Sequence, residues 1–262
     1  MSLFDGLEKI SNAVGTISQV EDIFQNNDPL SAVIKSVELF ENQSNVTAST
    51  TPKQAENLPA PTRLNIKTDA NTPIPVVYGS AWTTGSVTDA QLNTLNGDCI
   101  LSVCITLCEK TGTLMSDSTD SLITLKEVYM NNKRMIFGAD GVTISGLEDP
   151  DTGEINTEVA GLVEIYPFSG GSLEPTFFSF TNDTGNTQPA YHVMPNWTTD
   201  HTMDNLVFAI CKVKYKPEKG IDTLPDFEFQ LSNTMRKPGD CIYDYLTSTR
   251  YGAGLSDEEI AS

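Results

Sequence analysis

Short apolar runs, separated by clusters of turn-forming residues, dominate this chain between residues 64 and 232. Gly, Asn, Asp, Thr and Ser gather between the runs, and these residue types favour turns and loops. Runs of strand length that are interrupted so often predict a mainly β fold. The predicted strands are Ile74–Tyr78, Ile100–Leu107, Leu122–Tyr129, Met135–Phe137, Leu162–Tyr166, Phe177–Phe180 and Leu206–Tyr215.

Alternation of side chains supports two strands in particular. Phe227, Phe229 and Leu231 alternate with polar residues, which is the period-two pattern of a half-buried strand. In the run Leu206–Tyr215, alternate residues would point to opposite faces of a strand. The first residues are apolar on both faces, and lysines occupy one face in the second half. We therefore expect the first half of that strand to be buried on both faces and the second half on one.

A helix is predicted after the strand that contains Phe229, because a Pro-Gly pair breaks the strand pattern there. Asp240 is expected to cap this helix, since a carboxylate accepts the free backbone N–H groups of a first turn. Ile242, Tyr245 and Leu246 then fall on one helical face. By themselves these residues predict a strand–helix–turn packing unit and no catalysis.

The end of this helix is also predictable. Gly252 and Gly254 are expected to end the helix, and as glycines they permit positive φ. Arg250 and Tyr251 lie at the same end, where a cation suits the helix dipole. The run from Ser256 to Glu259 is typical of a capping box that opens another helix.

Two segments of the chain are similar to one known family. They are IPVVYG at residues 74–79, and LPDFEF at residues 224–229 with YDYLTSTRYGAGL at residues 243–255. In this order they resemble the tail-tip and baseplate-hub proteins of tailed bacteriophages, the type found in lambda-like phages and gene transfer agents. The family continues after the first segment with an arginine and a Gly-Gly pair, whereas this chain has Ser80 and a single Gly85. The resemblance covers roughly residues 64–255, and it implies structural roles for Pro75, Tyr78, Gly79, Asp240, Tyr245, Arg250, Tyr251, Gly252 and Gly254.

This resemblance implies a structural virion protein, a hub or adaptor ring subunit of a phage tail tip or baseplate. In the family, β-rich hub domains from three subunits close a ring that joins the tail tube to a central spike or fibre and surrounds a DNA passage. It implies a homotrimer in the virion tail, assembled in the host cytoplasm, with the tail tube or distal tail protein and the spike or fibre as partners. The alternative is a virion adhesin or carbohydrate-binding β module with a shallow aromatic patch, for which the candidates are Trp82, Trp197, Tyr166 and Tyr191.

The N-terminus carries an amphipathic pattern. Its apolar residues follow a three-four spacing typical of one helical stripe, namely Leu3, Leu7, Ile10, Val14, Ile17 and Phe24. The stripe can dock on its own chain, on a neighbouring protein, or on another copy in a short coil. Docking on a partner is favoured because a long polar linker follows. The expected organisation is a helical docking segment at 1–41, a linker at 42–63, β-barrel or sandwich hub domains at 64–232, and a helix–turn segment at 233–262 that leads towards a further domain.

The formal net charge of −19 disfavours specific nucleic-acid binding, because an acidic surface repels phosphates. Two interpretations of this charge stay open: an acidic lining that lets DNA pass without gripping it, or a surface that keeps the protein soluble. No run approaches the roughly 18 apolar residues of a membrane span. The N-terminus lacks the basic and then apolar pattern of a signal peptide, so no membrane partner is expected.

The sequence offers little for a catalytic, metal or cofactor site. The cysteines are odd in number, and the spacing of Cys99, Cys104 and Cys108 does not match paired CxxC motifs, so we expect all five, Cys211 and Cys241 included, to be reduced and buried. Residues 149–154 faintly resemble a calcium loop, but a hairpin tip is the favoured prediction. With two histidines and no GxSxG, HExxH, Walker or GxGxxG motif, no enzyme activity and no cofactor are expected.

Overall fold

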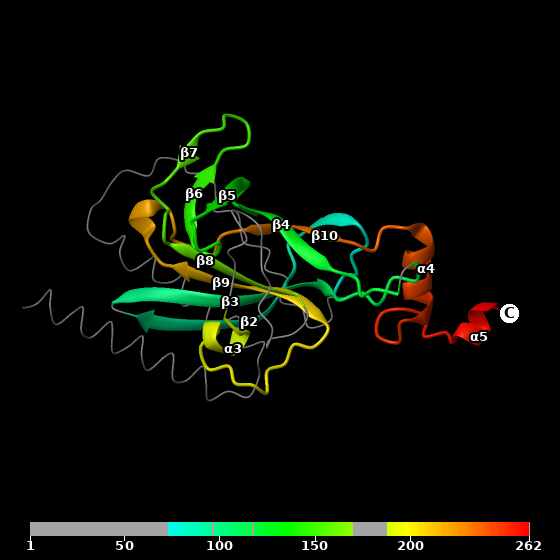
Figure 1. The fold of residues 1–262 in the computed structure, drawn as a ribbon. Coiled ribbons are helices and arrows are strands. Elements are labelled where there is room, and N and C mark those ends of the chain that lie inside the picture. Colours follow the sequence, from blue (N-terminus) through cyan, green and yellow to red (C-terminus); the bar gives the residue numbers. More distant parts are fainter. Residues whose placement is uncertain (1–72, 96, 117, 170–187, 262) are drawn as a thin grey trace, which may run out of the picture.

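The protein is built mainly from antiparallel β-sheets, as predicted (Figure 1). The computed structural model describes residues 73–95, 97–116, 118–169 and 188–261. The predicted N-terminal stripe from Leu3 to Phe24 and the linker at 42–63 lie outside these residues. Within the described part, the larger sheet has six strands in the order β1-β10-β4-β5-β6-β7. Their bounds are β1 Ser80–Thr83, β4 Ile123–Met130, β5 Lys133–Phe137, β6 Ile144–Glu148, β7 Ile155–Asn156 and β10 Phe227–Asn233.

The smaller sheet has four strands in the same part of the chain, in the order β2-β3-β9-β8. Its central strands, β3 and β9, contain two of the apolar runs that the sequence predicted as strands. In their register, Val103 of β3 lies opposite Cys211 of β9 on one side and Ala90 of β2 on the other. The bounds are β2 Ser86–Leu95, β3 Asp98–Glu109, β8 Val163–Ser169 and β9 Leu206–Lys214.

Both sheets contribute to one hydrophobic core, as in a β-sandwich. Leu101 of the smaller sheet and Phe229 of the larger sheet are fully buried in it. Each fully buried side chain of this kind stabilises the fold by about 1.5–3 kcal/mol relative to an exposed one. Other members from the two sheets are Val103, Ile105, Leu107, Val128, Met130, Val163, Ile165, Ala209, Cys211, Val213, Phe227 and Leu231.

A second apolar cluster covers the other face of the smaller sheet. Phe168 and Phe208 stack there with ring centroids 4.8 Å apart, and Trp197 packs beside them at 8% exposure. The short helix α3 (Ala190–Val193) belongs to this cover. Because both faces are covered, the first half of β9 is buried on both sides, as its sequence predicted, and its two lysines are only half-buried.

Hairpins connect β4 to β5, β5 to β6 and β6 to β7 in the larger sheet. Asn131 and Asn132 form the two-residue turn between β4 and β5, with φ of 51° and 63°. Turns with positive φ at both central residues match the twist of a hairpin, and asparagine adopts them readily. Residues 149–154 form the tip between β6 and β7, which confirms the predicted hairpin. The Asp149 carboxylate accepts backbone N–H groups two and three residues ahead.

The strand prediction was incomplete in the polar parts of the sandwich. The strands β1, β2, β6 and β7 were missed, because they are short or carry many polar side chains. The run Ile74–Tyr78 was predicted as a strand and is not one: it makes a single parallel bridge, between Val76 and Glu109. Pro75 has no backbone N–H with which to continue a ladder. The predicted strand Phe177–Phe180 lies outside the described residues.

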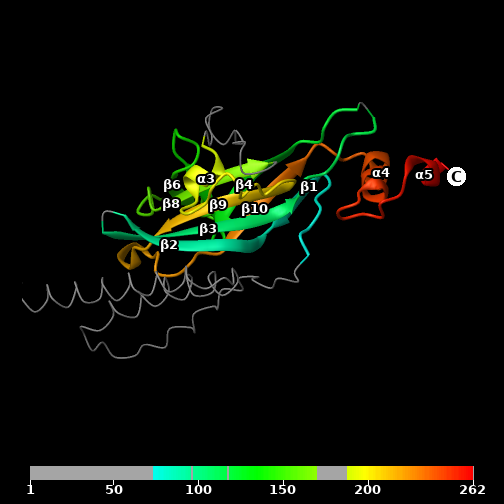
Figure 2. The same ribbon diagram turned by 90° about the horizontal axis from the view of Figure 1, so that it is seen from below.

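Two helices follow the sandwich, α4 (Pro238–Thr247) and α5 (Asp257–Ala261). Both lie beyond one end of the sheets in the two views (Figure 1 and Figure 2). At the start of α5, the Glu259 carboxylate accepts the backbone N–H of Ser256 at 2.8 Å, the reach-back bond of the predicted capping box. A single 3-10 turn, η1 (Pro217–Lys219), precedes β10. Among the described helices, none has the length and apolar character needed to cross a membrane.

The five cysteines are free thiols, as predicted. Four of them are buried in the sandwich. The prediction that Cys241 is buried is wrong: it lies on α4, outside the two sheets, and is partly exposed. Burial raises the pKa of Cys104 and of Cys108 to about 12, so both stay protonated and behave as small apolar side chains.

Candidate functional site

The carboxylate of Asp244, on α4, joins segments that are far apart in the sequence. Its Oδ2 accepts hydrogen bonds from the hydroxyls of Tyr78 and Tyr251, each at 2.7 Å. Its Oδ1 accepts the backbone N–H of Gly112 at 2.8 Å. The Asp244 side chain is only 5% exposed, so these donors stabilise its charge in place of water. We call Asp244 and its three donors the Asp244 network.

Asp240, one turn earlier on α4, faces the same way. Its carboxylate accepts the backbone N–H of Ser116 at 3.0 Å and the Ser116 hydroxyl at 3.1 Å. The prediction that Asp240 caps the helix is wrong. The helix begins at Pro238, whose fixed φ suits a first helical position, and Lys237 occupies the N-cap without a side-chain capping bond in the described structure. Asp240 therefore lies inside the first turn and binds the loop between β3 and β4 instead.

The helix α4 is amphipathic in the reverse of the usual sense. Asp240 and Asp244 are its buried residues, whereas Ile242 and Tyr245 are 60% and 52% exposed. The shared face of Ile242, Tyr245 and Leu246 was predicted correctly, but it points away from the sandwich. Helices usually bury their apolar stripe against the body of the protein. Carboxylates, and not apolar side chains, therefore hold this helix in place.

The chain after α4 folds back along the helix. The backbone N–H of Ala253 donates to the carbonyl of Tyr245 at 2.9 Å. A Cβ on Gly252 would overlap that carbonyl oxygen, so this position needs glycine for close approach. Gly254 has a φ of +66°, and Gly252 does not adopt a positive φ. The prediction that these two glycines end the helix is wrong, because α4 already ends at Thr247, with Ser248 as its C-cap. The return of the chain brings the Tyr251 hydroxyl to the carboxylate on α4.

A second buried hydrogen-bond network centres on Asn233, the last residue of β10. Its Nδ2 donates to the carbonyl of Val77 at 2.7 Å and to the hydroxyl of Thr111 at 2.8 Å. Its Oδ1 accepts the backbone N–H of Met235 at 2.8 Å, and its own N–H donates to the carbonyl of Gly79 at 2.6 Å. Asn233 is fully buried and ties the segment before β1 to the end of β3 and to the chain that enters α4.

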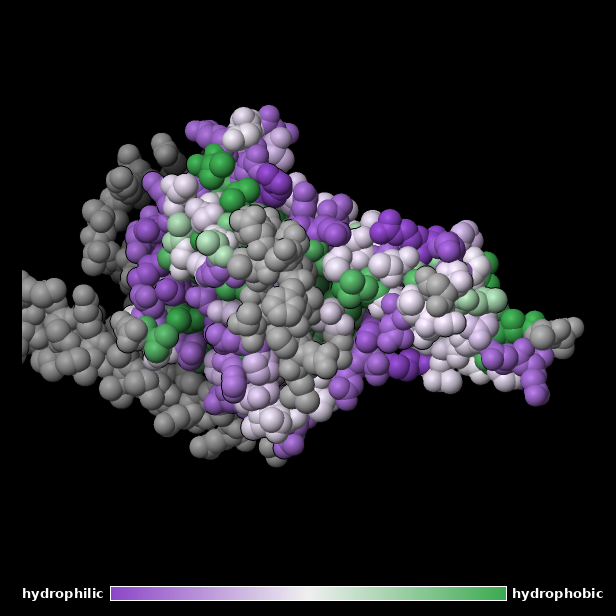
Figure 3. Space-filling model, viewed as in Figure 1, coloured by the Kyte–Doolittle hydropathy of each residue, from purple (hydrophilic) through white to green (hydrophobic). Residues whose placement is uncertain are grey.

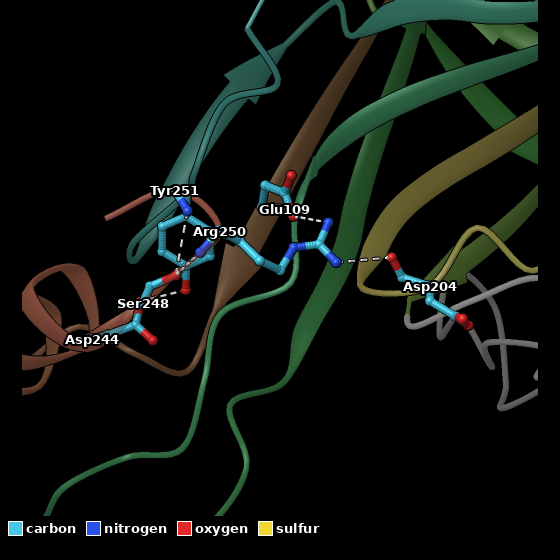
Figure 4. A network of polar contacts seen from close by, with 6 residues as sticks. All are labelled: Glu109, Asp204, Asp244, Ser248, Arg250 and Tyr251. Carbon is cyan, nitrogen blue, oxygen red and sulfur yellow. Dashed lines mark hydrogen bonds and ion pairs between the residues drawn. The ribbon is translucent and has the colours of Figure 1, made fainter. Parts of the chain in front are cut away.

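Arg250 adds further contacts at this junction between the sheets and the chain around α4, and its side chain lies between Glu109 and Asp204 (Figure 4). Its guanidinium forms an ion pair with Glu109, at the end of β3, at 2.7 Å. It also donates to the backbone carbonyl of Asp204 at 3.3 Å. Arg250 lies beyond the last turn of α4, so the predicted interaction with the helix dipole is replaced by this ion pair.

The surroundings of the two tyrosines in the network favour their neutral form. Burial, followed by the hydrogen bond to Asp244, raises the pKa of Tyr78 and of Tyr251 well above the ordinary value of 10.0. Both hydroxyls therefore remain protonated donors at neutral pH. A general base needs a pKa near the working pH, which these groups do not have. The arrangement is suited to holding chain segments together and not to proton transfer.

An open pocket of about 530 Å³ lies beside the network. Its walls come from the end of β3, from α4 and from the turn after α4, and include Lys110, Thr113, Asp120, Asn205 and Arg250. In the part of the chain that the structure describes, no group of three or more His, Cys, Asp or Glu side chains is placed to hold a metal ion.

Most of the residues to which the sequence resemblance assigned structural roles lie close to Asp244 and Asn233. Tyr78 and Tyr251 bind the same carboxylate, and Gly79, with a φ of +69°, donates its N–H to the carbonyl of Met235 at 2.9 Å. The exposed Pro75 contributes only its carbonyl, which accepts the N–H of Glu109 at 2.9 Å. Tyr245 points to solvent and does not join them.

Asp244 and Asn233, the two residues at the centre of the junction, were not predicted from the sequence. Asp244 stands inside the YDYL run, and its four-residue spacing from Asp240 was a signal that both carboxylates share one helical face. Asn233 carries no comparable local signal, because its partners come from distant parts of the chain.

The aromatic residues considered for a carbohydrate-binding patch do not lie together. Trp82 is on β1 of the larger sheet, 48% exposed, with the Tyr129 ring 5.2 Å away at its edge. Trp197 is buried in the cluster over the smaller sheet, and Tyr166 and Tyr191 pack beside that cluster. The four candidates are therefore divided between the two sheets.

No protein-family model matches the chain, and no curated protein matches it. One solved chain, from a structure described as the virion of a native gene transfer agent (GTA) particle, is similar with a TM-score of 0.32 and 13% sequence identity. The alignment covers 100% of this chain and 46% of that one, so the chain spans less than half of its length. A TM-score at this level carries no argument about fold or function.

Proposed function

We propose that this chain is a structural virion protein, a hub or adaptor ring subunit of a phage tail tip or baseplate. In this proposal three copies form a ring that connects the tail tube to a central spike or fibre. The subunit has no catalytic role and uses no cofactor, and it takes its place in the tail during assembly in the host cytoplasm.

The Asp244 network is the observation that carries this proposal. The two segments that resemble the hub family, residues 74–79 and residues 243–255, are far apart in the sequence. Tyr78 from the first and Tyr251 from the second donate to the same carboxylate, which lies in the second segment. The matching residues thus form one structural unit, and two unrelated chance matches would not be expected to meet in space.

The physical character of the junction also suits a structural role. Its charged groups are satisfied by donors within the chain, and its tyrosine hydroxyls hold their protons more firmly than usual. Such a network fixes the angle between the sandwich and α4 instead of presenting reactive groups. A virion adhesin or carbohydrate-binding module has less support, because the proposed aromatic patch is divided between the two sheets.

The acidity of the chain suits a ring through which DNA passes. With a net charge of −19, an acidic inner wall would repel the phosphates and let the DNA slide without gripping it. An electron cryo-microscopy map of the assembled ring would test this part separately. We expect carboxylates on the inner wall, and a neutral or basic wall with the acidic residues outside would contradict it.

Immunogold labelling of intact particles tests the location directly. A short epitope placed in the exposed hairpin tip at residues 149–154 is distant in sequence from α4 and leaves the Asp244 network unchanged. Gold is expected at the tail end away from the head, and particles without the epitope provide the control. Purified, infectious particles that lack the tagged chain would refute the proposal.

A further inference from the structure

The outer face of α4 is an apolar surface on a rigidly held helix. Ile242 and Tyr245 are 60% and 52% exposed, and Leu246 on the same face is half-buried. Within the described residues, the Tyr245 hydroxyl has no hydrogen-bond partner. The inward carboxylates of Asp240 and Asp244 fix the direction in which this face points. An exposed apolar face on an ordered element is typical of an interaction site.

An acidic rim borders this face at the start of α5. Asp257, Glu258 and Glu259 are consecutive and exposed. The hydroxyl of Tyr243, on α4, donates to the Asp257 carboxylate at 2.6 Å, which places the rim next to the helix. Hydrogen bonds from Ser256 lower the pKa of Glu259, so its charge persists at neutral pH. Figure 3 shows hydrophobic and hydrophilic surface side by side at this end of the molecule.

We propose that the outer face of α4 docks a different protein, one that presents apolar side chains flanked by lysine or arginine. Apolar contact with Ile242 and Tyr245 would supply the affinity, and basic groups opposite Asp257 and Glu258 would set the orientation. A second copy of this chain is a poor occupant, because pairing the same face of two copies brings two acidic rims together. The inference rests on the proposed function in one respect: the partner is a neighbouring tail protein.

The docking surface is already ordered before a partner binds. Because the Asp244 network already holds α4, a partner does not have to order the helix on binding, and the entropy lost on association is smaller. Tyrosine is a common anchor of protein interfaces, since it buries a large ring and still offers a hydroxyl. Ile242 lies on the same face as Tyr245, and an aspartate there would place a charge in the apolar contact. Ile242→Asp is therefore expected to weaken binding about 30-fold or more, as for an interface hot spot.

The experiment uses the full chain and two probes, the purified tail-tube protein and the purified spike protein of the same virion. Their affinities for the wild-type chain, Ile242→Asp and Glu258→Lys are measured by biolayer interferometry at about 0.05 M and 0.5 M salt, which changes charge screening strongly. Leu95→Asp is the matched control, because Leu95 is an equally exposed apolar residue on β2, at 57%. Circular dichroism and the solution mass show whether each variant is folded and in what assembly state.

The expected result is that one probe binds, that Ile242→Asp abolishes most of this binding, and that Leu95→Asp does not. Glu258→Lys and high salt should each weaken binding less strongly. Unchanged binding by folded Ile242→Asp would overturn the inference, and so would an equal loss in the Leu95→Asp control. Self-association through this face, abolished by Ile242→Asp, would show a second copy as the occupant and overturn it as well.

The failure of this inference can be distinguished from failure of the proposed function. If the chain is present in the virion tail and Ile242→Asp is incorporated at the wild-type level, only the docking inference fails. If the wild-type chain is absent from virions and binds neither probe, the proposed function fails with it.

Discussion

Replacing Asp244 with alanine should release α4 from the sandwich while the two sheets stay folded. The substitution removes the acceptor of three hydrogen bonds, from Tyr78, Tyr251 and Gly112. A hydrogen bond to a charged group contributes about 1.5–3 kcal/mol, so the three together set an upper range of about 4.5–9 kcal/mol. Water can enter the space left by the carboxylate and recover part of this, so we expect a net loss of about 2–4 kcal/mol.

This loss corresponds to an increase of about 30- to 700-fold in the opening of α4. Native-state hydrogen exchange measures it, with the amides of α4 as the reporter and those of β3 and β9 as the internal reference. Asp257→Asn is the matched control, because that exposed aspartate also accepts one tyrosine hydroxyl, from Tyr243. Unchanged exchange in α4 would refute the role of the carboxylate. Equal acceleration in β3 would refute the claim that α4 opens as a separate unit.

Three further predictions concern the two tyrosines of the network, Gly252 and the cysteine thiols. Because the folded-state pKa of Tyr78 and of Tyr251 is raised above 10.0, their stabilisation of the fold is complete below about pH 10 and falls as the pH rises through the raised values. Absorbance titration should show tyrosines that ionise late, one fewer in Tyr78→Phe, and ordinary titration of every tyrosine would contradict this. Gly252→Ala should accelerate exchange in α4 as Asp244→Ala does, since the added methyl group overlaps a helix carbonyl, and wild-type exchange would count against it. A thiol reagent should label only Cys241 in the native protein and all five cysteines after unfolding, and rapid native labelling of more thiols would disprove the buried positions.

Sequence patterns predicted the strands that carry strong apolar signals. The central strands β3 and β9 and the alternating strand β10 are buried on one or both faces. Their apolar side chains therefore form continuous or alternating runs that can be seen in the sequence. The edge strand β2 was missed because only its middle residues, Ala90 to Leu92, are buried. Polar side chains occupy many of its positions, and one of them, Gln91, is itself buried, so the strand shows no hydrophobic alternation.

The contacts around Asp244 were harder to predict from the sequence. The apolar face of α4 was predicted correctly, but sequence periodicity does not say whether such a face meets the same chain or another one. The contacts of Asp240 and Asp244 with the loop after β3 determine that the apolar face of α4 points away from the sandwich. The partnership of Tyr78 with Asp244 depends on the pairing of β1 with β10, which brings the two segments to the same end of the larger sheet.

The solution mass of the purified chain, alone and mixed with the tail-tube and spike proteins of its virion, tests the central claim most directly. Light scattering is expected to find a trimer, or a stable complex in which this chain is present in threefold stoichiometry. A persistent monomer that binds neither protein would contradict the assignment of this chain as a hub subunit.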